Sequence, residues 1–343
     1  MSIQDAKSHG GHVTRALSVL LVAGVAGGLV VFAYLGGTES LVSALTRITW
    51  WQFGLVCAVY GVGVIADTLG WRYALGRDQS PRFLRLLAAK CAGEAVNVVT
   101  ALGSVGGEAT KAWLLRRDVP YEASVPSLIV AKTSLVLAQA LLIAVGILVA
   151  WTTGVGGPTL LLAMNVLLLV EVIGVGGFLG VQLAGVVGRA GRALAWLGAD
   201  RTGHAQWLDD ALRRFYRREW RSFLVSAGFH FVGWLIGAVE AFLILAALGL
   251  PASLVVATVI EALGSGVRFV TFFVPASLGA LEGANAGAFG ALGWAASAGL
   301  AFSVVRRARQ AVWIGVGLAI LLATNPRSVI AGPPFRPVPS GGH

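Results

Sequence analysis

The sequence predicts an all-α, polytopic membrane protein of about seven or eight spans, with two broken or re-entrant segments in an inverted repeat. The first observation is composition: 57% of the 343 residues are hydrophobic and 12% are charged, against about 25% charged residues in soluble domains. The second is a series of apolar runs that reach the roughly 20 residues needed to cross a bilayer. The third is a pair of apolar stretches interrupted by charges and by glycine or proline.

The apolar runs define one membrane domain with short polar ends. They cover 16–36, 53–75, 124–150, 159–184 and 222–250, and more apolar sequence follows at 253–324. No small-residue cleavage site follows the first run, so we interpret it as a retained span. The predicted boundaries are a cytoplasmic head at 1–15, a transmembrane domain at 16–324 with halves of about 16–150 and 159–324, a basic cytoplasmic loop at 185–221, and a disordered proline-rich tail at 325–343.

The positive charge follows the pattern of a topology signal. The net charge is +10, but the arginines lie in short loops between apolar runs, so we expect no nucleic-acid partner. Arginines crowd the loop at 185–221, whereas 151–158 and 249–251 carry no charge. The positive-inside rule therefore places this loop and the N-terminus in the cytoplasm.

The number of membrane crossings after Pro251 stays open. Two crossings after Pro251 place Arg306, Arg307 and Arg309 outside, whereas one crossing or a re-entrant hairpin reverses their side.

The first polar interruption occupies an apolar stretch around a glycine-rich break at 103–107. Its polar residues are spaced three or four apart, which places them on one helical stripe on each side of the break: Lys90, Glu94 and Asn97 before it, and Glu108 and Lys111 after it.

The second interruption repeats this design around a break at 275–279. Its polar residues are Glu261, Ser265 and Arg268 before the break, and Glu282 and Asn285 after it. The preceding spans run in opposite directions, so the two copies form an inverted repeat. Paired, interrupted segments of this kind are typical of a transporter's substrate site near the bilayer midplane.

We predict that the two breaks bind the polar head of a lipid. A helix that begins at a break points free N–H groups at the gap, which suits an anionic group such as a lipid phosphate. Arg268 and Lys111 add full charges, and the glutamates hold basic groups or a coupling proton. The predicted substrate-binding residues are Glu94, Asn97, Gly106, Gly107, Glu108, Lys111, Lys132, Glu261, Arg268, Pro275, Gly279, Glu282 and Asn285.

Structural alternatives exist for these residues. Lys90 with Glu94, and Glu261 with Arg268, are also spaced to pair with each other and join helices. The glycines also suit close helix packing, although the consecutive Gly106 and Gly107 fit packing less well. Other intramembrane ionisable residues carry weaker evidence, with Lys132 and Gln139 the best placed and His230 the most typical of a core residue; the rest are Asp67, Glu171 and Glu240.

Two motifs carry a resemblance to a known family. The strings are GEAVNVVTALGSVGGEATKAWLLRR and, much later, FVPASLGALEGANAGAFGALG. Together they resemble the paired signature of the flippase-like family, which includes the transmembrane region of lysylphosphatidylglycerol synthases, and are most similar to its hopanoid-associated members. Two departures are alanine at 101, where proline is frequent, and Ala276-Ser277, where a glycine pair is frequent.

The resemblance implies a multi-pass protein of the bacterial inner membrane that moves lipids between leaflets or supports lipid export. We therefore expect a flippase-like transporter of an amphiphilic lipid, either a hopanoid or an anionic phospholipid. Its partners would be membrane lipids, with lipid-biosynthesis proteins as possible further partners. The alternative is a non-transporting scaffold for lipid biosynthesis.

A third function class is an aminoacyl-phospholipid enzyme component, and the sequence argues against it. The short tail after Thr324 leaves no room for a soluble transferase domain. Nucleotide-binding, nucleophile-elbow and metal-ligand motifs are missing, so we expect no enzyme activity, no catalytic residue, no metal and no cofactor.

Overall fold

The computed structural model describes residues 45–76, 78–79, 81–99, 104–184 and 202–324, and every regular element in these residues is helical. The elements are α3 (Trp50–Ala74), α4 (Phe83–Val99), α5 (Ser104–Leu115), α6 (Tyr121–Thr153), α7 (Gly157–Ala184), α9 (Thr202–Arg218), α10 (Trp220–Ala247), α11 (Leu254–Val270), the 3-10 turn η1 (Pro275–Ser277), α12 (Ala280–Ala291) and α13 (Ala296–Ala323). The all-α prediction is confirmed for this part of the chain. The predicted head, the first span and the proline-rich tail lie outside the described residues.

Four described helices have the length and apolar composition of a membrane span, namely α3, α6, α7 and α10. Helix α13 is as long as α10, at 28 residues, but carries Arg306, Arg307 and Arg309 along its length. The sequence interpretation treated these arginines as loop charges, and this was wrong. They lie inside a helix of spanning length, where charged groups are costly unless they are paired.

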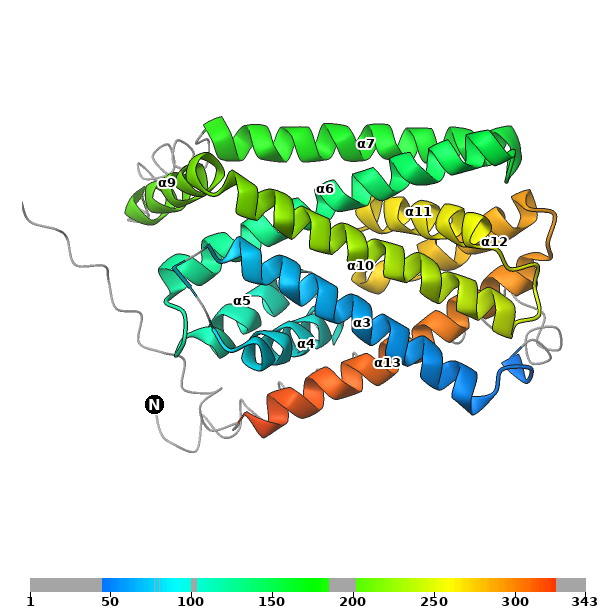
Figure 1. Cartoon of the computed structure of the whole chain (residues 1–343), viewed down its shortest axis with the longest axis horizontal. Coiled ribbons are helices and arrows are strands. Elements are labelled where there is room, and N and C mark those ends of the chain that lie inside the picture. Colours follow the sequence, from blue (N-terminus) through cyan, green and yellow to red (C-terminus); the bar gives the residue numbers. More distant parts are fainter. Residues whose placement is uncertain (1–44, 77, 80, 100–103, 185–201, 325–343) are drawn as a thin grey trace, which may run out of the picture.

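The two interrupted segments form helical hairpins. We call α4 and α5 hairpin 1, and α11 and α12 with the turn between them hairpin 2. In both, the first arm has 17 residues and the second has 12. At a rise of 1.5 Å per residue the arms are about 25 and 18 Å long, short of the roughly 30 Å hydrocarbon core, so each hairpin is re-entrant. Figure 1 shows hairpin 1 at the end of the molecule that carries α9, and hairpin 2 toward the opposite end.

The described helices form two repeats with the same order of elements and opposite orientation. Helix α3, hairpin 1 and α6 correspond to α10, hairpin 2 and α13, and α3 runs beside α10 in the opposite direction (Figure 1). The two helices approach closely at Gly63 and Gly233, where a Cβ on Gly233 would lie 3.7 Å from the Gly63 carbonyl oxygen. Small residues at such a crossing let two backbones pack directly. Helix α7 lies outside this repeat.

The chain marks several helix ends with local signals. Thr49 and Gln52 form a capping box at the start of α3, and the Ser253 side chain accepts the Val256 N–H at the start of α11. Helix α6 begins after Pro120 and ends at Gly154, which has a φ of 72°.

The basic segment predicted as a loop is partly helical. Residues 185–201 lie outside the described part, but α9 is an amphipathic helix whose buried Leu212 belongs to an apolar cluster with residues of α3, α4, α5 and α6. Its exposed side carries Arg214, Arg217 and Arg218. An amphipathic helix with arginines on its exposed face is typical of a membrane surface.

Candidate functional site

Hairpin 1 is joined by a lysine held between two glutamates. The Lys111 ammonium of α5 donates to Glu94 Oε1 of α4 at 2.8 Å and to Glu108 Oε1 at 2.9 Å. The Lys111 side chain is 5% exposed, whereas that of Glu94 is 46% exposed. The predicted residues Glu94, Glu108 and Lys111 therefore come together, and Glu94 forms the accessible end of the group.

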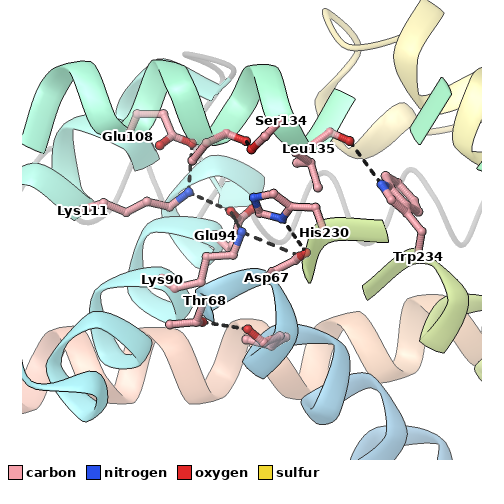
Figure 2. A network of polar contacts seen from close by, with 12 residues as sticks. Asp67, Thr68, Lys90, Glu94, Glu108, Lys111, Ser134, Leu135, His230 and Trp234 are labelled. Carbon is pink, nitrogen blue, oxygen red and sulfur yellow. Dashed lines mark hydrogen bonds and ion pairs between the residues drawn. The ribbon is translucent and has the colours of Figure 1, made fainter. Parts of the chain in front are cut away.

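The network continues across α3 and α10, as Figure 2 shows. The Lys90 ammonium lies 3.4 Å from Glu94 Oε1 and 3.8 Å from Asp67 Oδ2. His230 Nδ1 lies 3.0 Å from Asp67 Oδ1. Acidic and basic side chains thus alternate from hairpin 1 to α10. The sequence analysis counted Asp67 only among the weaker intramembrane candidates, because its bridging position depends on tertiary packing.

The glycines of hairpin 1 serve close packing. A Cβ on Gly93 would lie 2.8 Å from the Gly107 carbonyl oxygen, and one on Gly107 would overlap the Gly93 carbonyl and the Asn97 amide. The Gly107 N–H also donates to Asn97 Oδ1 at 2.8 Å. The expectation that Gly106 and Gly107 lie in the break was wrong, because α5 begins at Ser104. The predicted residues Asn97 and Gly107 fasten the arms together.

Two polar residues of α6 face the hairpins. Lys132 is exposed and lies within electrostatic range of Glu94 and Glu108. Two turns further on, the Gln139 amide donates to the Ser265 carbonyl of α11 at 2.5 Å. Helix α6 therefore contacts both halves of the repeat.

Hairpin 2 is fixed to α13 through Glu261. Arg268 donates to Glu261 Oε1 at 2.6 Å, and Arg306 of α13 donates to Glu261 Oε2. The Glu261 side chain is 4% exposed and that of Arg268 is 30% exposed. The Arg268 guanidinium also lies over the Trp234 ring of α10, 5.2 Å from its centroid. Arg268 is therefore the accessible end of this second group, as Glu94 is of the first.

The sequence analysis named Glu240 and the three arginines of α13, but it missed that they form ion pairs. Glu240 Oε1 lies 3.0 Å from Arg309 Nη2 and 3.8 Å from Arg306 Nε. Arg307 donates to Glu282 Oε1 of α12 at 2.8 Å. The available signal was the run of three arginines inside an apolar stretch of spanning length, which requires buried acidic partners.

The turn of hairpin 2 has the conformation that glycine favours. Ala276 and Ser277 have φ values of 52° and 50°, in the left-handed region. Arg307 donates to the Ala276 carbonyl at 2.8 Å, and the Thr271 hydroxyl donates to Ser277 Oγ at 2.8 Å. Predicted residue Pro275 begins this turn. The alanine and serine that replace the family's frequent glycine pair thus keep a glycine-like backbone.

The predicted anion site at the helix starts is partly filled by the chain itself. Glu282 Oε2 accepts the Gly279 N–H at 2.8 Å, as Asn97 accepts that of Gly107. Asn285 is buried and donates to Ser303 of α13 at 2.8 Å, so it joins helices. The side chains of Arg268 and Lys111 are therefore better anion ligands than these backbone groups.

Among the described residues, the charges of the cluster that hairpin 2 forms with α10 and α13 do not balance. Three guanidinium groups, those of Arg268, Arg306 and Arg309, share two carboxylates, Glu240 and Glu261. Arg307 and Glu282 form a separate neutral pair. Arginine is always protonated, so the cluster carries one positive charge in excess. The buried Nε atoms of Arg306 and Arg309 also lack a hydrogen-bond acceptor within the described part of the chain.

Helix α10 links the two groups. A Cβ on Gly233 would lie 2.8 Å from Asp67 Oδ1, and one on Gly237, a turn later, would lie 3.1 Å from Glu261 Oε1. Glycine at these positions admits one carboxylate from each half of the repeat. The alternative in which the polar residues pair among themselves describes many of these contacts, but it leaves the excess charge unexplained.

The comparisons with known proteins give one match. A family model described as Lysylphosphatidylglycerol synthase TM region matches residues 16–319. No curated protein and no solved structure matches the chain.

Proposed function

We propose that this chain, which belongs to the Lysylphosphatidylglycerol synthase TM region family, moves an amphiphilic lipid between the leaflets of a bacterial inner membrane. The family match spans most of the chain and identifies a multi-pass, lipid-related membrane protein. The proposal assigns it lipid movement rather than a lipid-modifying reaction.

The excess positive charge of the cluster around hairpin 2 carries the proposal. A charge at membrane depth costs about 2.5–3.5 kcal/mol even on lenient insertion scales, so an unbalanced guanidinium needs an anionic partner. Arg268 is the accessible member of the cluster, and its planar group suits a phosphate. A lipid head that enters beside Arg268 would supply the missing negative charge.

The inverted hairpins supply a route between leaflets. Hairpin 1 enters from the α9 end and hairpin 2 from the opposite end, and both present an accessible charge, Glu94 and Arg268 (Figure 1). Opposed repeats around a shared polar region support alternating access. A lipid head would pass from one hairpin to the other along α10.

The excess charge favours an anionic phospholipid as cargo. A hopanoid is the second candidate, because the motif in hairpin 1 resembles that of hopanoid-associated family members. A hopanoid without an anionic head would leave the Arg268 cluster unbalanced.

The distribution of positive charge supports one orientation of the protein in the membrane. The α9 end carries Arg214, Arg217 and Arg218, whereas the described loops at the opposite end after α6 and α10 have no charged residue. The positive-inside rule favours a cytoplasmic α9 end. Helix α13 ends on this same side (Figure 1).

A reconstituted assay tests the proposal. Purified protein in vesicles would be given fluorescent anionic phospholipid, fluorescent zwitterionic phospholipid or labelled hopanoid, with and without a proton gradient. We expect faster exchange of anionic phospholipid between leaflets. Glu94→Gln should slow it, and the matched control Glu122→Gln, at an exposed position of α6, should not. Wild-type protein that moves none of these lipids would favour the scaffold instead.

A further inference from the structure

Helix α7 buries an acid in its apolar inner face. Leu160, Met164 and Val175 mark this face, and Glu171 continues it at 0% exposure. Neither carboxyl oxygen of Glu171 has a hydrogen-bond partner within the part of the chain that the structure describes. Buried carboxyl groups are normally bonded or paired, so this one requires an explanation.

Glu171 lies where α7 packs on hairpin 2. A Cβ on Gly266 of α11 would lie 3.0 Å from Leu167 Cβ, and one on Gly174 would lie 2.8 Å from the Phe269 ring. Leu167 and Gly174 are one turn before and one turn after Glu171 on the same helix. The carboxyl group therefore lies between two tight α7–α11 contacts, next to the last turn of the first arm.

Within the described residues, no basic side chain of a neighbouring helix is hydrogen-bonded to Glu171. On α11, Glu261 and Arg268 bind each other, and on α12 Glu282 binds Arg307. On α6, Ile143 lies close to Gly266 of α11. The next polar residue of α6 is the uncharged Gln139, one turn away, which binds the Ser265 carbonyl, and Lys132 is two turns further.

Helix α9 also packs on α7, at the far end of the helix. There the Tyr216 hydroxyl donates to Gln182 at 2.9 Å, about three turns from Glu171. The charged groups of α9 therefore lie well away from the buried carboxyl group.

We propose that Glu171 is a proton-binding site whose occupancy sets how tightly hairpin 2 packs against α7. A neutral carboxylic acid fits this dry, apolar contact. An ionised carboxylate requires water or a cation, and neither reaches a group at 0% exposure unless α7 and α11 separate. Release of the proton to water therefore accompanies separation of the two helices, and proton uptake accompanies their closure.

Separation of α7 from α11 would shift the arm that carries Glu261 and Arg268. Because the two equilibria are linked, a proton gradient would bias the position of the lipid site. This consequence rests on the proposed lipid transport, whereas the proton site itself does not.

Infrared spectroscopy of the protein in an ester-free detergent tests the site without any transport. Wild-type protein at neutral pH should show the carbonyl band of a protonated carboxylic acid, and Glu171→Gln should remove it. Glu122→Gln, which removes an exposed acid of α6, should leave the band unchanged. A band that persists in Glu171→Gln, or that wild-type protein lacks, overturns the proposal.

Hydrogen exchange measures the coupling to hairpin 2. Wild-type and Glu171→Gln proteins would be compared at equal pH, which cancels the intrinsic pH dependence of exchange. We expect the α11 amides of wild-type protein to lose protection at alkaline pH relative to the variant. A second variant, Glu171→Leu, should fold and show the same protection as Glu171→Gln. Equal α11 protection in all three proteins at every pH excludes the coupling, even if lipid transport is confirmed.

Discussion

Asn97 Oδ1 of α4 accepts the Gly107 N–H of α5 at 2.8 Å, and a side chain at position 107 would overlap that same amide. The bond and the missing side chain therefore depend on each other. Hairpin 1 closes only because its second arm presents a bare backbone to the first.

Gly107→Ala should open hairpin 1. The added methyl group must displace the Asn97 amide or the Gly93 carbonyl, so we expect a loss of about 1–3 kcal/mol in stability, typical of overpacking. Thermal unfolding in detergent measures the loss. Gly176→Ala in α7, where the added Cβ meets nothing within 4 Å, is the control and should keep or slightly raise stability, because alanine favours a helix over glycine. Equal melting temperatures for both variants would contradict the packing role of Gly107.

Lys111→Met should destabilise the protein by leaving Glu94 and Glu108 without their shared cation. Removal of one partner from a buried pair costs about 3–5 kcal/mol, and we expect the lower end because the Glu94 side chain is 46% exposed. Arg85→Met breaks a pair with Asp118, but the Arg85 side chain is 54% exposed, so its loss should lower stability much less than the loss of Lys111. Similar unfolding curves for the two variants would mean that Lys111 is solvated in the folded protein.

The sequence predicts contacts that lie within one helix. Glu261 and Arg268 are seven residues apart, so helical periodicity places them on one face, and they form an ion pair at 2.6 Å. The second partner of Glu261, Arg306, lies 45 residues away in sequence. No local pattern connects these two residues, because their contact depends on how hairpin 2 packs against α13.

The adjacent glycines of hairpin 1 show a similar limit of prediction from local sequence. A pair of adjacent glycines predicts a break, since glycine weakens helices, yet Gly107 lies inside α5. The gain from close packing against α4 outweighs the propensity. That gain depends on Gly93 and Asn97 of α4, which lie opposite Gly107, and a local sequence pattern does not reveal this contact.

Ala276→Gly should stabilise the protein. The left-handed conformation at Ala276 costs a residue with a Cβ about 1–2 kcal/mol, and glycine adopts it freely at some cost in chain entropy. We expect a net gain of about 0.5–1 kcal/mol in thermal or denaturant unfolding. Ala286→Gly, inside α12, is the control and should lose about 1 kcal/mol. A loss of stability in Ala276→Gly would mean that the turn relaxes in the membrane.

Arg268→Gln should separate lipid movement from stability. Glu261 keeps its bond to Arg306, so the variant should fold with a stability loss of no more than about 1 kcal/mol. It removes the excess charge and the accessible donor, and the loss of one charged hydrogen bond predicts about a tenfold or greater fall in the rate for anionic phospholipid. Arg268→Lys keeps the charge without the planar fork and should recover part of the rate.

Arg306→Gln should affect stability more than Arg268→Gln does, and it completes this test. Arg306 binds Glu261 and the Gly237 carbonyl and lies beside Glu240, so its loss should lower stability more than the loss of Arg268 does. Rates would be normalised to folded protein in the same vesicles, with Arg218→Gln on the exposed side of α9 as a control for net charge. If Arg268→Gln moves anionic phospholipid as fast as wild-type protein does, Arg268 does not hold the lipid head. The excess charge would then need another partner.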